Sequence, residues 1–224
     1  MKRIDFLAGF LALAAASPVL AKDDFQYWNT LEITKRLNPQ WEVFFRPEMR
    51  MEDGASHLFY HEYRQGVRWN FSPHLQVGLH YLFVRNESAT SGKTRDEQTG
   101  EIDVTPTWKW AAVDLSVRGR AELRTIQGSA GEQEYRIRLM PKAGYPMKLS
   151  GHKVTPYVAV DLFYDYTRKA WNQHRDFLGI VVPLRETKET SVTADFYYMH
   201  QNLLGARHDR SSNHILGTKL NVRF

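Results

Sequence analysis

The chain contains no cysteine, and this absence excludes both a disulfide framework and a thiolate metal site. Beyond the first 21 residues it also lacks an apolar run long enough to form a transmembrane helix. The remaining residues therefore belong either to a soluble protein or to a chain that crosses a membrane as a barrel of strands.

The first residues are typical of a secretory signal peptide. Lys2 and Arg3 precede the apolar stretch 6–16, and small residues lead up to Ala21. This pattern predicts cleavage before Lys22. The alternative, a short anchor helix, would need about 20 apolar residues. We expect residues 1–21 to be a signal peptide and residues 22–224 to form one domain.

The formal net charge is +5, and a positive net charge would suit the binding of nucleic acid. An exported protein rarely meets nucleic acid, so we expect no such partner. The basic residues must instead be accounted for by where they lie in the fold. We also expect no cofactor and a monomer.

Apolar and polar residues alternate through most of the chain, which is the period of a strand with two unlike faces. Val113, Leu115 and Val117 share one face, while Arg118 and Arg120 lie on the other. Segments of roughly 10 to 13 residues have the length that a tilted strand needs to cross a bilayer. About eleven segments can be distinguished, starting near Phe25, Trp41, Leu58, Leu75, Glu101, Val113, Glu134, Val154, Asn172, Ser191 and Asn213.

Short and long connections alternate between these segments, as in bacterial barrels with short periplasmic turns and longer extracellular loops. We therefore predict a transmembrane antiparallel β-barrel of about 10 to 12 strands in the cell outer membrane. An odd count is unusual there, so either ten or twelve is the true number or the barrel closes by an unusual pairing. The short connections are 38–40, 72–74 and 150–152, and the longer ones are 52–57, 87–100, 125–133, 167–171 and 203–212.

A soluble periplasmic β-protein is the alternative, because a sandwich also alternates. Opposite charges crowd the polar face, which favours a barrel. The chain ends by alternating to Phe224, which resembles the insertion signal of outer-membrane barrels. Lipid, lipopolysaccharide and the barrel-assembly machinery are the partners expected. Aromatic residues gather toward strand ends on the apolar face, as at membrane interfaces: Tyr27, Trp41, Trp69, Phe71, Trp108, Trp110, Tyr145 and Tyr164.

Several stretches resemble the outer-membrane barrels grouped as domain of unknown function 2490. The likeness rests on residues 27–32 with 37–41, 118–124, 135–139, 156–164 and 214–217, which together span nearly the whole mature chain. The resemblance implies a barrel in the outer membrane and no assigned activity, so it supplies no catalytic residue.

The polar face predicts a ladder of charges in the lumen. As a polar core these side chains would neutralise one another across strands, and as a pore lining they would pass small polar or anionic solutes. Four guanidinium groups, of residues 118, 120, 136 and 138, could hold an anion unless Glu122 and Glu134 neutralise them. The predicted ladder is Arg46, Arg50, Arg64, Arg68, Arg118, Arg120, Arg124, Arg136, Arg138, Glu48, Glu62, Glu122, Glu134 and Asp161.

Two further functions are open: a hydrolase acting on lipid or lipopolysaccharide, and a structural or surface-interaction barrel. Residues 211–214 hold serines and His214, yet His214 is predicted to face lipid and no acidic partner can be placed. His61, His80 and His200 lie on different strands without metal-ligand spacing. We predict neither a catalytic residue nor a metal site, and favour an unassigned barrel or narrow charge-lined channel.

Overall fold

The computed structural model describes residues 22–88, 91–128, 133–204 and 210–224. The predicted signal peptide, residues 1–21, lies outside them. No helix in the described part of the chain has the length and apolar character to cross a membrane. The strands are β1 (Lys22–Arg36), β2 (Trp41–Glu52), β3 (His57–Ser72), β4 (Leu75–Glu87), β5 (Thr94–Trp110), β6 (Val113–Ile126), β7 (Gln133–Gly144), β8 (Met147–Leu149), β9 (His152–Asp165), β10 (Ala170–Glu186), β11 (Ser191–Leu204) and β12 (Arg210–Arg223).

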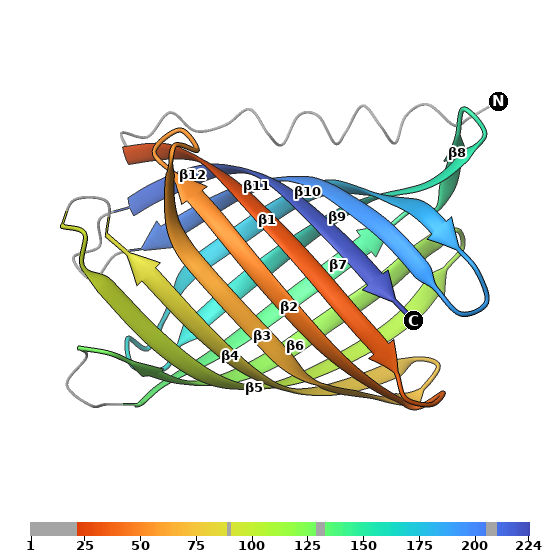
Figure 1. Cartoon of the computed structure of the whole chain (residues 1–224), viewed down its shortest axis with the longest axis horizontal. Helices are drawn as coiled ribbons and strands as arrows, with labels where there is room; N and C mark the ends of the chain where they lie inside the picture. The colour runs from red at the N-terminus through yellow and green to blue at the C-terminus, as the bar shows by residue number, and fades with distance from the viewer. Residues whose placement is uncertain (1–21, 89–90, 129–132, 205–209) are drawn as a thin grey trace.

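Eleven of these strands close into a single tilted barrel (Figure 1). The strand β8 is a short addition that pairs only with the start of β9. Consecutive barrel strands are hydrogen-bonded neighbours, because short connections place each strand beside the one before it. The predicted all-β transmembrane barrel is confirmed.

The barrel closes where β1 lies parallel to β12, from Lys22 beside Ser211 to Thr34 beside Arg223. We call this pair the seam. In an up-and-down barrel with an odd number of strands, the first and last strands run in the same direction, so they can pair only in parallel. The count of eleven is therefore correct, and the expected antiparallel pairing is replaced by a parallel one at the seam.

The two ends of the barrel differ in their connections. The turn end carries connections 37–40, 73–74, 111–112 and 187–190, the β8 hairpin and Phe224. Turn chemistry shapes it: the Asn38 side-chain oxygen accepts hydrogen bonds from the amides of Gln40 and Trp41, both at 2.9 Å. At the opposite end, called the loop end, strands β2, β4, β6, β9 and β11 finish.

One predicted loop proves to be partly strand. The strand β5 begins at Thr94, opposite Glu87, so only the first half of the predicted loop 87–100 is a connection. The sequence pattern misses this extension because both faces of residues 94–100 are polar. On the outer face Asp96 forms an ion pair with Arg85 of β4 at 2.8 Å.

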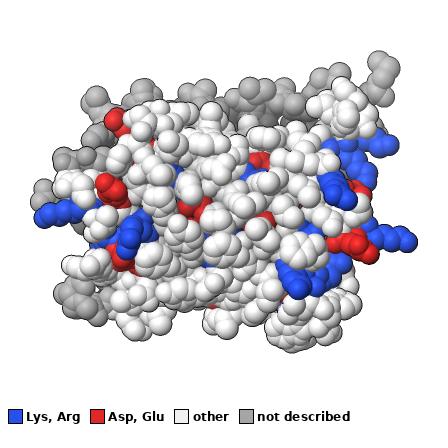
Figure 2. Space-filling model, viewed as in Figure 1, with Lys and Arg blue, Asp and Glu red and all other residues white. Residues whose placement is uncertain are grey.

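The outer wall is apolar between two polar rims. On the face drawn in Figure 2, charged side chains gather at the two ends of the long axis. Leu79 and Ile102, in the middle of the wall, are each more than half exposed. Large exposed apolar surface belongs against lipid, whereas the charged residues Glu62, Arg64 and Glu101 are buried inside. This inversion is what distinguishes a membrane barrel from a soluble one.

Candidate functional site

The lumen contains two groups of ion pairs on neighbouring strands, which together we call the ion-pair belt. One part joins Arg46 to Glu62 at 2.7 Å. Arg64 contacts both Glu62, at 3.1 Å, and Glu101, at 2.8 Å. These groups can stay charged while buried because each finds a partner with hydrogen bonds. The belt comprises Arg46, Glu62, Arg64, Glu101, Asp103, Arg120, Glu122, Arg138 and Asp161.

Strand register places some like charges of this belt directly opposite each other. Arg46 lies opposite Arg64, and Glu101 lies opposite Glu122. Directly opposed like charges are unfavourable, but diagonal neighbours are within reach of long side chains. Arg64 accordingly reaches Glu101 across β4, where His80 stands directly between Gly66 and Glu101. The expected cross-strand neutralisation therefore runs diagonally for Arg64 and Glu101, whereas Asp103 and Arg120 pair directly across β5 and β6 at 2.6 Å.

Several guanidinium groups also lie over aromatic rings inside the barrel. Arg50 is held between Trp28 and Tyr60, 3.7 Å from each ring centroid, and Arg68 lies 3.9 Å from the centroid of Phe44. A desolvated cation over a ring is stabilised by the ring quadrupole. The aromatic rings thus add to the ion pairs that Arg50 forms with Glu48 and Arg68 with Glu32.

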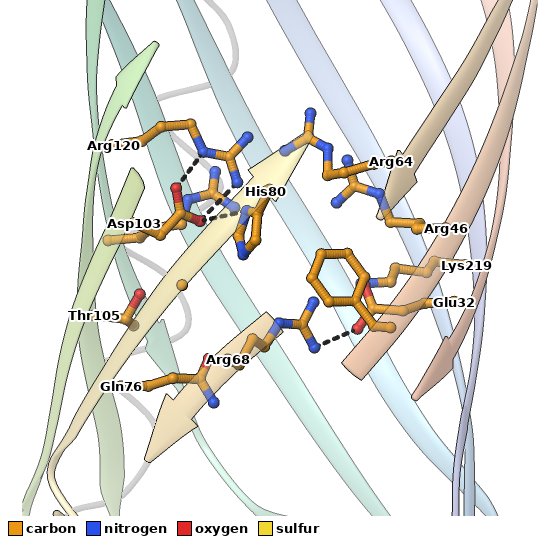
Figure 3. A pocket seen from close by; sticks show the side chains of 13 residues that line it. Glu32, Arg46, Arg64, Arg68, Gln76, His80, Asp103, Thr105, Arg120 and Lys219 are labelled. Carbon is orange, nitrogen blue, oxygen red and sulfur yellow. Dashed lines mark hydrogen bonds and ion pairs between the residues drawn. The ribbon is translucent and has the colours of Figure 1, made fainter. Parts of the chain in front are cut away.

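Beside the belt is a cavity of about 150 Å³, seen in Figure 3 between facing walls of the lumen. Six cationic side chains line it, against only two carboxylates. Glu32 is shared by Arg68, at 2.9 Å, and Lys219, at 3.0 Å. We call this space the cationic cavity. Its cations are Arg46, Arg64, Arg68, Arg118, Arg120 and Lys219, and its acids are Glu32 and Asp103.

Arg118 is the least neutralised of these cations. Its nearest carboxylate oxygen, on Asp161, is 3.6 Å away, and its Nη2 lies 3.2 Å from the sulfur of Met140. Its buried Nε has no hydrogen-bond partner among the described residues. A buried guanidinium with unused donors is suited to bind a further anion.

A histidine forms one wall of the same cavity. The His80 Nδ1 lies 3.5 Å from Glu101 and 3.7 Å from Asp103, and neither ring nitrogen has a hydrogen-bond partner within the described ranges. Two glycines make room for the ring, since a Cβ at Gly78 would lie 2.4 Å from His80 Nε2 and one at Gly66 would lie 2.8 Å from Cδ2. Sequence reasoning considered His80 as a metal ligand and so did not associate it with the arginines.

Comparison with known proteins assigns the family. The model of the family described as "Protein of unknown function (DUF2490)" matches residues 25–212, which is most of the chain. The chain belongs to the DUF2490 family. None of the curated proteins matches it.

Among solved structures, this DUF2490 barrel is similar to an anion-selective porin from Comamonas acidovorans, with 13% identity and a TM-score of 0.35. The alignment covers 82% of this chain and 53% of the porin, so the chain spans about half the length of that protein. A likeness of this size carries no functional argument.

All fourteen residues of the predicted ladder lie on the lumen side of the DUF2490 barrel, but the four clustered arginines do not form one anion site. Glu122 binds Arg136 at 2.5 Å and Arg138 at 3.1 Å. Glu134 pairs with Arg124 instead, at 3.1 Å. Arg120 binds Glu101 and Asp103, which leaves Arg118 to face the cationic cavity.

The remaining predicted positions are Arg50, Arg68, Glu48 and Phe224. Arg50 pairs with Glu48 at 2.7 Å, and Arg68 with Glu32. Phe224 lies at the turn end, half exposed, where its amide donates to the Thr34 carbonyl at 3.0 Å and its carbonyl accepts from the Arg36 amide at 2.7 Å. It therefore continues the seam by one residue.

Sequence reasoning missed several lumen residues. Glu97, Thr99 and Glu101 continue the alternation of Asp103 toward the loop end, a signal that the assignment of 87–100 to a loop concealed. Arg175, near the rings of Trp28 and Phe163, follows a register shift between Trp171 and Gln173 that obscures the alternation of β10.

His214 faces outward, as the alternation predicts, and its Nδ1 is 2.6 Å from the Tyr198 hydroxyl. Ser212 shares this outer face with His214, while Ser211 belongs to the opposite one. In the described part of the chain, no group of three or more His, Asp or Glu residues is arranged to hold a metal ion.

Proposed function

We propose that this protein is a narrow channel for small anions across the outer membrane, with the cationic cavity as its binding site. The observation that supports the proposal is the excess of cations over carboxylates around a cavity of about 150 Å³ inside a closed barrel. Fixed charges of one sign in a pore select solutes of the other sign. The barrel fold is consistent with an outer-membrane location.

The ion-pair belt would be the constriction of this channel. Its side chains are almost inaccessible, at 0% for Glu101 and 2% for Arg120, whereas those of Lys219 and Arg223 toward the turn end are 27% and 43% exposed. An anion could pass by replacing a carboxylate as the partner of an arginine, an exchange that leaves each guanidinium paired. The expected conductance is therefore small.

A planar-bilayer recording of the refolded protein tests the proposal. We expect stepwise currents that favour anions over cations in a salt gradient. Replacing Arg118→Glu should shift the reversal potential toward cations, because Arg118 contributes charge to the cavity that no close carboxylate cancels.

Arg85→Glu is the matched control, since Arg85 lies on the outer wall and should leave selectivity unchanged. Absence of conductance in protein shown to be folded would contradict the proposal. Conductance without a response to Arg118→Glu would contradict the assigned binding site. Release of fatty acid from lipid, without current, would favour the hydrolase.

A further inference from the structure

The outer wall over β10, β11 and β12 differs from the rest of the apolar wall. It carries a groove of about 480 Å³ that opens toward lipid. Leu178, Phe196 and Leu216 flank it and are each about half exposed. Gly179 and Gly217 lie beneath it, and a Cβ at either position would point into the barrel and collide with the ring of Tyr157 or Tyr197.

Polar side chains lie on the same outer face at the loop end of this groove. Asn202 Nδ2 lies 2.8 Å from His174 Nε2 and 3.2 Å from His200 Nδ1. The rings of His200 and His214 stack with centroids 5.2 Å apart, and His214 contacts the Tyr198 hydroxyl. We call His174, Tyr198, His200, Asn202 and His214 the imidazole cluster.

Charged groups border the imidazole cluster on the loop-end side. Arg168 of the connection 166–169 donates from Nη1 to the Leu204 carbonyl at 3.4 Å, which brings its half-exposed guanidinium to the end of β11. A carboxylate also contacts the cluster on this face: Asp176 lies 3.5 Å from His174 Nε2. Imidazole, phenol, amide and guanidinium donors together suit a phosphate.

We propose that this face binds one molecule of lipid A, with an acyl chain in the groove and a phosphate against the imidazole cluster. The apolar groove and the polar cluster are contiguous along the outer face of the strands. On β12, Leu216 is the next outward residue after His214, and on β11, Phe196 is the outward residue just before Tyr198. In bacterial barrels the longer loops face the exterior, so the cluster lies at the level of the outer-leaflet headgroups. The lipid of that leaflet is a phosphorylated glycolipid with several acyl chains.

The test is a titration of lipid A into the detergent-folded protein, with bound molecules counted by native mass spectrometry. We expect one tightly bound lipid A and affinity about tenfold or more weaker for lipid A stripped of its phosphates. Binding of phosphatidylethanolamine should also be weaker, because it presents one phosphate and fewer chains. Equal binding of the three lipids would overturn the proposal.

Variants locate the site. The double variant His200→Leu, His214→Leu should weaken lipid A binding about tenfold. Leu216→Trp, which fills the groove and keeps the imidazole cluster, should also weaken it. The matched control is His61→Leu, an outward histidine on β3 opposite Met49 of β2, and it should bind lipid A as the unchanged protein does.

Heat-dependent migration in detergent electrophoresis shows whether each variant is folded. If His61→Leu weakens binding as much as the double variant does, the assignment of the site is wrong. The double variant should keep the ion selectivity of the unchanged protein, because its residues face away from the lumen. A failure of this inference is therefore distinguishable from a failure of the proposed channel.

Discussion

The lumen has two unlike sides. Along β2 to β7 and β9 the lumen is lined by the ion-pair belt. Along β10 to β12 and β1, an apolar cluster is buried on the lumen face of the wall instead. Trp28, Met199 and Ile215 form that cluster, at most 4% exposed, and Phe177 and Tyr197 pack against it. All residues of the predicted ladder lie on the charged side, on β2, β3, β6, β7 and β9.

The apolar side contains the seam, and this location has a physical reason. Antiparallel neighbours inherit their register from the turn that joins them, but no turn joins β1 to β12. Side chains must therefore define the register of the seam. Ile215 packs with Trp28 inside, while Thr218 accepts a hydrogen bond from Asn29 at 2.8 Å outside.

The largest expected effect comes from breaking the charged side. Glu62 is 2% exposed and contacts Arg46, Arg64 and Arg50. Glu62→Leu removes the carboxylate that pairs with Arg46 and leaves Arg64 with Glu101 and Arg50 with Glu48 as their remaining partners. We expect the free energy of unfolding in urea, measured in lipid vesicles, to fall by about 3–5 kcal/mol.

Glu186→Gln is the control for Glu62→Leu. Glu186 pairs with Lys153 at 3.1 Å, with both side chains about two-thirds exposed. Such a pair contributes less than about 1 kcal/mol. Similar losses in the two variants would show that the belt contributes no more than a surface pair.

The next largest effect is expected from an arginine substitution on the outer wall, compared with one in the lumen. Val117→Arg places a charge against lipid and should lower the free energy of unfolding by about 2–4 kcal/mol near the midplane. Ser116→Arg, one residue earlier and facing the lumen opposite Lys142, should cost less than about 1 kcal/mol. Equal tolerance at the two positions, in the same vesicle measurement, would count against the assignment of faces.

The smallest effect probes the apolar side at the seam. Ile215 is fully buried, so Ile215→Val should lower the free energy of unfolding by roughly 0.5–1.5 kcal/mol through the space it leaves. Ile102→Val, on the outer wall, should change it by less than about 0.5 kcal/mol because lipid fills the gap. A larger loss of free energy of unfolding in Ile102→Val than in Ile215→Val would mean that the seam cluster is loosely packed.

Much of this architecture could be predicted because alternation assigns faces without knowledge of strand partners. Arg120 and Arg138 lie inside and Ile137 and Leu139 outside, as a period of two requires. The partners of the arginines could not be predicted, as Glu134 shows by binding Arg124 and not the neighbouring cluster. Nor did any local pattern indicate that Arg118 would keep an unused donor.

The sequence by itself determined the class of the protein and the side of the wall that each residue of a strand occupies, because a period of two requires only the geometry of one strand. The tertiary structure alone decided the parallel seam, the diagonal ion pairs, the apolar side of the lumen and the cationic cavity. These features depend on the register between strands and on closure of the barrel, which join residues far apart in the chain.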